Sequence, residues 1–153
     1  MATTDGTGRD QINHDRPTGV DDATVAAVGK LSEAVELLER VRGRFFDLHQ
    51  MVGHLDLQMG EAAEMLQASG HPEAAALVEH QAVGRNVIDG RWTFQLVEEF
   101  NEQFYEPIKQ VERQITDELM AGRQHVFEAE MKERRRTHGA AGHERRPGST
   151  TDE

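Results

Sequence analysis

The sequence predicts an all-α fold, namely a long antiparallel helical hairpin with a short connecting helix, pairing with a second copy into a four-helix bundle. Residues 31–66 and 91–137 carry apolar side chains at steps of three and four, the spacing of one helix face. The roughly twenty residues between them are too few for a parallel return along such a helix. We therefore expect the two long helices to lie antiparallel.

The first long helix is expected to begin at Asp21 or Asp22, because a carboxylate there can accept hydrogen bonds from the free amides of a first turn. Its apolar seam extends over five heptads. The seam residues are Leu31, Ala34, Leu38, Val41, Phe45, Leu48, Val52, Leu55, Met59, Ala62 and Leu66. A flanking row of Leu37, Met51 and Met65 widens this seam, and a stripe of such width favours two neighbouring helices. We therefore predict a homodimer.

The connecting segment is predicted to hold a short helix over residues 72–83. Ser69 and Gly70 are typical of a helix end, and Pro72 is tolerated in a first turn because it needs no amide partner there. The chain should therefore turn back directly after residue 70.

The second long helix is predicted as one helix over residues 91–137. Pro107 removes a backbone hydrogen bond, so we expect a kink at residues 103–107. The midpoint of the hairpin suggests a trial register in which the numbers of paired residues add up to about 160. This register places the kink opposite Gly53.

The domain organisation follows from what each segment can bury. Residues 1–20 and 138–153 contain few apolar side chains that could offset the entropy of ordering, so we predict a disordered tail at each end. Residues 21–137 form the predicted hairpin domain.

The composition excludes several classes of function. The formal net charge of -11 argues against nucleic acid or an anionic membrane as partner, because both repel an acidic surface. The absence of cysteine excludes disulfides, thiolate zinc sites and cysteine nucleophiles. No apolar run is long enough to span a membrane or form a secretory signal, so we expect a cytoplasmic protein.

An acidic ridge on the second helix is the candidate site for a protein partner. Its residues are Glu98, Glu99, Glu102 and Glu106. Like charges four residues apart repel by a few tenths of a kcal/mol per pair unless something offsets them. Solvent, a basic protein partner or a metal ion could do so.

The candidate metal ligands are His54, Glu61, Glu64 and Glu102, because carboxylates with one imidazole suit iron or manganese. Against this reading, no histidine has a glutamate three residues before it, which is the spacing of carboxylate-bridged di-iron bundles. His54 also falls on the outer side of its helix. We therefore expect no cofactor, and keep iron or manganese as the alternative.

Arg42, His49 and Asp56 form a polar row with Val35 and Ala63 beside the seam. We interpret these polar groups as contacts that fix the register between helices, with Glu118 as the expected partner of Arg42.

A basic run near the C-terminus comprises Lys132, Arg134, Arg135 and Arg136, with Arg145 and Arg146 beyond it. We interpret it as a charged helix end, because cations complement the dipole there. Contact with nucleic acid is the alternative, although no aromatic residues for base stacking interleave with the run.

The function predicted from these features is that of a non-catalytic interaction or scaffold protein, whose partners are a second copy and another protein. The alternative is a carboxylate and histidine metal-binding bundle of the ferritin-like oxidoreductase or storage class. We identify no catalytic residues and no phosphate-binding, nucleophile-elbow or dinucleotide motif, so an enzyme is not expected.

Overall fold

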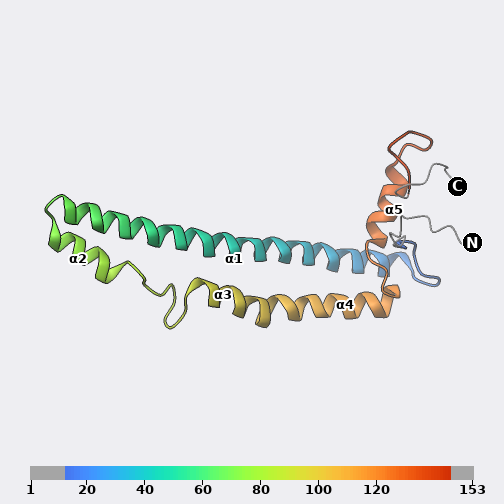
Figure 1. The fold of residues 1–153 in the computed structure, drawn as a ribbon. Helices are drawn as coiled ribbons and strands as arrows, with labels where there is room; N and C mark the ends of the chain where they lie inside the picture. The colour runs from blue at the N-terminus through green and yellow to red at the C-terminus, as the bar shows by residue number, and fades with distance from the viewer. Residues whose placement is uncertain (1–12, 146–153) are drawn as a thin grey trace, which may run out of the picture. The chain divides into compact units, whose positions relative to one another are not determined.

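A computed structural model of the chain describes residues 13–145 (Figure 1). They contain the helices α1 (Asp22–Ala68), α2 (Pro72–Gln81), α3 (Thr93–Phe100), α4 (Glu106–Met120) and α5 (Val126–Arg135), with the π-helix η1 (Asn101–Tyr105) between α3 and α4. Between residues 13 and 145 the only β-type pairing is one isolated bridge, Ile88 with Arg91. The all-α prediction is confirmed, while pairing into a four-helix bundle stays a prediction.

The chain divides into two compact units, which we describe separately. Within the described range, unit 1 comprises residues 13–34 and 111–145, and unit 2 comprises residues 35–110. Helices α1 and α4 contribute residues to both units.

Helix α1 begins and ends where the sequence predicts. The Asp21 carboxylate accepts a hydrogen bond from the Thr24 amide at 2.7 Å, which satisfies one free donor of the first turn. At the other end, Gly70 adopts a left-handed conformation with φ of 87°, and the His71 amide donates to the Leu66 carbonyl at 2.9 Å. This is the typical closure of a helix by glycine. Pro72 then opens α2, which ends two residues earlier than predicted.

Unit 1 has a small apolar core. Val25 and Val28 of α1 pack with Met120 of α4 and Val126 of α5, and all four are buried. Val20 and Ile115 pack against this cluster.

The prediction of one continuous helix over residues 91–137 is wrong, because the chain breaks between α4 and α5. Ala121, Gly122 and His125 all have positive φ, and the Gly122 amide donates to the Thr116 carbonyl at 3.1 Å. These left-handed residues end α4 and start a new helix. The break brings Val126 into the core of unit 1.

In unit 2, α1 lies antiparallel to residues 71–110, which we call the returning half. Four pairs define this register: His49 with Thr93, Phe45 with Phe100, Arg42 with Asn101, and Glu39 with Tyr105. The trial register, which would have placed residue 111 opposite His49, is wrong. The turn lies at Gly70, so α2 already belongs to the returning half, whereas the trial register centred the turn about ten residues later.

The wide turn η1 overlaps the predicted kink region, residues 103–107. The Glu106 amide donates to the Asn101 carbonyl, five residues back, directly before Pro107. Proline has no amide hydrogen and its ring crowds the carbonyl four residues before it, so the helix accommodates Pro107 by widening. Because the trial register is wrong, the prediction that Gly53 lies opposite this turn is wrong as well.

Candidate interaction surface

The polar row of α1 points toward the returning half of unit 2. Arg42 Nε donates to Asn101 Oδ1 at 2.8 Å, and His49 Nδ1 lies 2.7 Å from Thr93 Oγ1. Asp56 Oδ1 accepts a hydrogen bond from the Gly84 amide at 2.6 Å. Three contacts spaced by seven residues hold α1 in one rotation against its neighbours. The prediction that Glu118 is the partner of Arg42 is wrong, because Arg42 donates to Asn101 instead.

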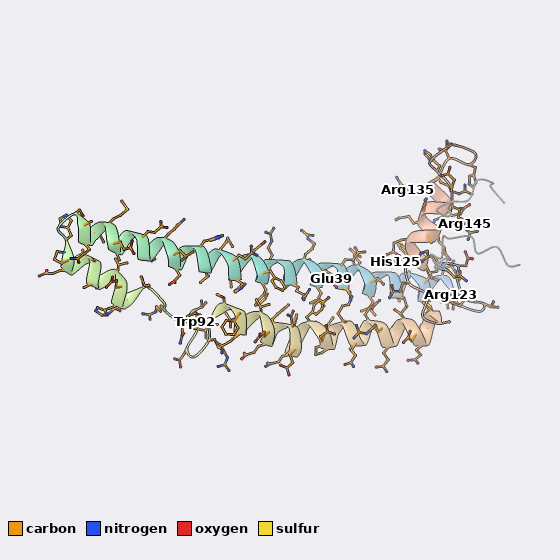
Figure 2. All side chains as sticks on the ribbon, in the orientation of Figure 1. Glu39, Trp92, Arg123, His125, Arg135 and Arg145 are labelled. Atoms are coloured by element: carbon orange, nitrogen blue, oxygen red, sulfur yellow. The ribbon has the colours of Figure 1, made fainter. Side chains whose placement is uncertain are left out.

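A charged cluster surrounds η1. The Tyr105 hydroxyl donates to the Glu39 carboxylate at 2.8 Å, and Lys109 Nζ lies 3.1 Å from the same group. Figure 2 labels Glu39, whose side chain comes from α1. The hydrogen bond from Tyr105 and the charge of Lys109 lower the pKa of Glu39, and Glu39 in turn raises the pKa of Tyr105. The Arg42 guanidinium lies 4.7 Å from the centre of the Tyr105 ring. Each charge here has a partner, so the cluster stabilises the helix pair rather than activating a reactive group.

This rotation of α1 leaves an apolar surface uncovered. Leu38 is buried, and the ring of Phe45 stacks on Phe100 at 4.1 Å, so their heptad row faces inward beside the polar row. The residues that immediately precede the inward ones point about 100° away around the helix. We call the large apolar residues among them the exposed stripe: Leu37, Val41, Leu48, Met51, Leu55 and Met65.

The exposed stripe has the geometry of a helix-packing seam. Its members follow steps of three and four once Arg44, Gln58 and Ala62, which occupy the intervening positions, are included. Their exposed fractions run from 38% at Val41 to 72% at Met65. The seam predicted from the sequence is therefore only partly covered within the chain. The polar row Arg42, His49 and Asp56 was the sequence signal that could have predicted this rotation of α1.

The acidic ridge is neither continuous nor wholly unpaired. Glu99 Oε1 accepts a hydrogen bond from Arg91 Nε at 2.5 Å, whereas Glu98 and Glu102 are exposed. Because η1 lies within the ridge, residues four apart no longer align as they would in an α-helix. Glu106, also exposed, follows this wide turn.

The four metal candidates are not brought together. Within residues 13–145, no group of three or more His, Asp or Glu side chains could hold a metal ion. His54, Glu61 and Glu64 are exposed on α1. Glu102 belongs to η1, which contacts α1 at Arg42, about three turns from His54.

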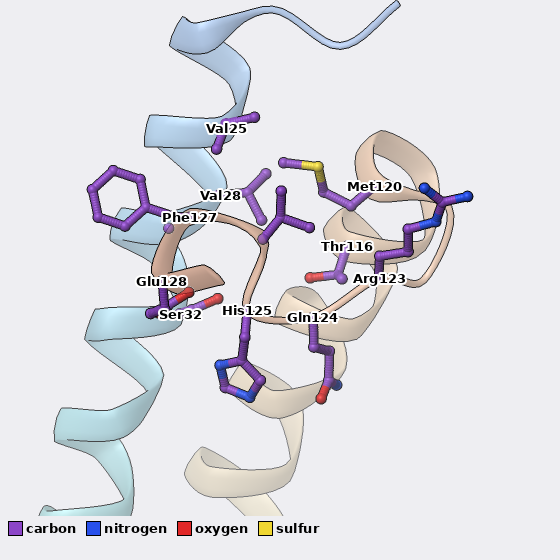
Figure 3. Close-up of a pocket in the computed structure, with 12 residues that line it drawn as sticks. Val25, Val28, Ser32, Thr116, Met120, Arg123, Gln124, His125, Phe127 and Glu128 are labelled. Carbon is purple, nitrogen blue, oxygen red and sulfur yellow. The ribbon is translucent and has the colours of Figure 1, made fainter. Parts of the chain in front are cut away.

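Unit 1 contains a shallow cavity beside its apolar core (Figure 3). Val28, Met120 and His125 are among the residues that line it, and its free volume of about 10 Å³ has room for roughly one water molecule. A cavity of this size is a packing gap rather than a ligand site.

Charged contacts tie the ends of unit 1 together. Arg16 binds Glu130 through two hydrogen bonds of 2.7 and 2.8 Å and also contacts Asp22 at 2.6 Å. Asp15 forms an ion pair with Arg145 at 2.6 Å. These contacts involve residues 13–20 and 138–145, which we assigned to the predicted tails. The remaining tail residues, 1–12 and 146–153, lie outside the described range.

The basic run is paired in part within unit 1. The Glu133 carboxylate accepts hydrogen bonds from Arg136 at 2.7 and 3.0 Å, and Arg134 lies 4.0 Å from Glu130. Lys132, Arg134 and Arg135 occupy the last turn of α5. This placement agrees with the interpretation as a charged helix end. Arg146 lies outside the described residues.

Comparisons place the chain in no known group. Protein-family models, curated proteins and solved structures were searched, and none matches this chain. Among residues 13–145, every helix is too short or too polar to cross a membrane.

Proposed function

We propose that this protein acts through protein–protein contacts, with the exposed stripe of unit 2 as its binding surface. The observation that carries the proposal is the row of large apolar side chains at helix-packing intervals along a helix whose other face is already occupied. Contiguous exposed apolar surface of this kind marks interaction sites in proteins. Helix-in-groove and bundle contacts use the same spacing of three and four residues.

The acidic ridge stays a second, separate prediction for a protein partner. Glu98 and Glu102 are exposed, and a basic protein would complement their negative charges. The ridge differs from the stripe in kind, because its contacts would weaken with salt whereas apolar contacts would not.

Site-specific photo-crosslinking in the native host tests the proposal. A crosslinker at Leu48, in the middle of the stripe, should capture a protein, whereas one at Leu57 should not. Leu57 is the matched control because it is the same residue type and is more exposed, at 66% against 39% for Leu48, but lies on another face of α1. A Glu102→Gln variant shows whether the ridge contributes to the same complex. Equal crosslinking from both leucines, or none from either, would refute the proposal.

A further inference from the structure

We infer that the occupant of the exposed stripe is a second copy of this chain, with the two α1 helices antiparallel and related by a twofold axis near His49 and Gln50. This inference rests on the proposed function and names the partner. The rotation of α1, the residues within the stripe and the charges beside it all support this arrangement.

The rotation of α1 provides two packing directions that suit a bundle. The inward rows contact the returning half of unit 2, and the exposed stripe points about 100° away from them. In a four-helix bundle each helix has two neighbours at roughly this separation. Two copies, each contributing α1 and its returning half, supply the four helices.

The apolar surface also continues from α1 onto the returning half. The Phe104 ring lies 5.5 Å from Phe100, which stacks on Phe45 of α1, and Phe104 is half exposed. A helix lying along the stripe would therefore cover apolar groups from both halves of unit 2.

The residues within the stripe favour an antiparallel arrangement. With the axis near residues 49 and 50, Leu48 of one copy faces Met51 of the other, twice, at the centre of the interface. Arg44 faces Leu55 of the second copy, so its stem lies on an apolar group while its guanidinium stays 3.1 Å from Asp47 of its own helix. A parallel pair would instead place Arg44 against Arg44, and like charges in a seam disfavour association.

The charges beside the stripe on one copy complement the same charges on a second copy when the two α1 helices pack antiparallel. The flank away from the returning half, which we call the charged flank, consists of Arg40, Asp47, His54 and Glu61. In antiparallel packing this flank faces the same flank of the second copy. Arg40 then meets Glu61, and Asp47 meets His54, each pair occurring twice because of the twofold symmetry. One helix surface thus supplies both members of each attractive pair.

The first part of the test is the molar mass of the full-length chain, measured by light scattering and sedimentation over a range of concentrations. The wild type should be a dimer. Leu48→Glu places a carboxylate at the centre of the interface and should weaken dimerisation by at least about 100-fold. The matched Leu57→Glu variant should dimerise like the wild type, and circular dichroism should show the same helix content in both.

The second part tests the register with charge reversals. Arg40→Glu and Glu61→Arg should each weaken the dimer about tenfold, because each creates two like-charge pairs. The double variant Arg40→Glu/Glu61→Arg should restore the wild-type affinity. Within one chain these residues are 21 positions apart, or about 30 Å along α1, so rescue can only come from another copy.

Three outcomes overturn the inference. A wild-type chain that stays monomeric at all concentrations excludes the second copy, and a double reversal no better than the single ones excludes the antiparallel register. A Leu57→Glu variant as defective as Leu48→Glu places the interface elsewhere. In the first case, a crosslink from Leu48 to a different protein would leave the proposed function standing, which separates the two failures.

Discussion

Unit 1 and unit 2 differ in how much apolar surface they leave exposed. In unit 1, three helices from both ends of the chain close a small core around Met120, and charged contacts such as Arg16 with Glu130 surround it. In unit 2, the polar row of α1 faces inward beside buried apolar residues such as Leu38 and Val97, and many large apolar groups stay exposed. Fourteen of the eighteen exposed large apolar side chains between residues 13 and 145 belong to unit 2. The difference supports the proposal that the binding surface lies on unit 2 rather than on unit 1.

The largest expected effect comes from shortening the same residue type in each unit. Met120→Ala removes a side chain that is 1% exposed from the core of unit 1, and should lower the free energy of unfolding by about 2 to 5 kcal/mol. Met65→Ala, at the end of the exposed stripe, should cost less than about 0.5 kcal/mol in dilute solution. Urea unfolding followed by circular dichroism measures both values. Equal losses would show that the two units do not differ as described.

A second pair of substitutions should change stability in opposite directions. An added Cβ at Gly29 would lie 2.8 Å from the Cβ and Cγ atoms of Phe127, so α5 must shift, and Gly29→Ala should cost about 1 to 3 kcal/mol. Gly43 has no neighbouring atom within 4 Å of such a Cβ, so Gly43→Ala should stabilise α1 by about 1 kcal/mol. Thermal unfolding checks the signs. A stabilising Gly29→Ala would mean that α5 does not pack on α1 in unit 1.

The smallest expected effect is the loss of folding stability at acidic pH. Hydrogen bonds from Thr24, Arg16 and Arg136 lower the pKa values of Asp21, Glu130 and Glu133 in unit 1. In unit 2, Glu39 is the one carboxylate with such a shift among the described residues. A carboxylate with a lowered pKa stabilises the fold above its ordinary value and loses that contribution as the pH falls through the lowered pKa.

Unit 1 should therefore lose more stability than unit 2 as the pH falls below about 4.5, the ordinary pKa of Glu130. Glu130→Gln removes one of these groups and should flatten the pH dependence more than Glu39→Gln does. Urea midpoints measured from pH 7 to pH 3 provide the comparison. An unchanged dependence in Glu130→Gln would show that its contact with Arg16 contributes nothing in solution.

The helices themselves were largely predictable, because their signals are local. Asp21, Gly70 and Pro72 mark helix ends through their own hydrogen-bonding and conformational preferences. The break after α4 was missed, since Gly122 stands in a pattern that otherwise continues as a helix. The Gly122 position is nevertheless where the left-handed turn forms.

The rotation of α1 and its register depend on distant residues, and they were not predictable from periodicity alone. The inward row with Leu38 and Phe45 and the exposed stripe both fit a spacing of three and four residues. This spacing therefore does not show which of them faces inward. The choice is made by partners that lie far along the chain, such as Asn101 for Arg42 and Thr93 for His49. The polar row was the one sequence signal for this rotation, and these contacts show that it faces inward and leaves the stripe exposed.

The wide turn η1 also bears on where the length of this chain can change. Loss of one residue between positions 101 and 105 would tighten the turn into an ordinary α-helical one, and its cost would be local, because the Pro107 ring would then crowd the carbonyl four residues before it. The same loss in the middle of α1 would rotate everything beyond it by about 100° and exchange the polar row for the apolar one. A one-residue deletion should therefore disturb the helix pair less in η1 than in the middle of α1.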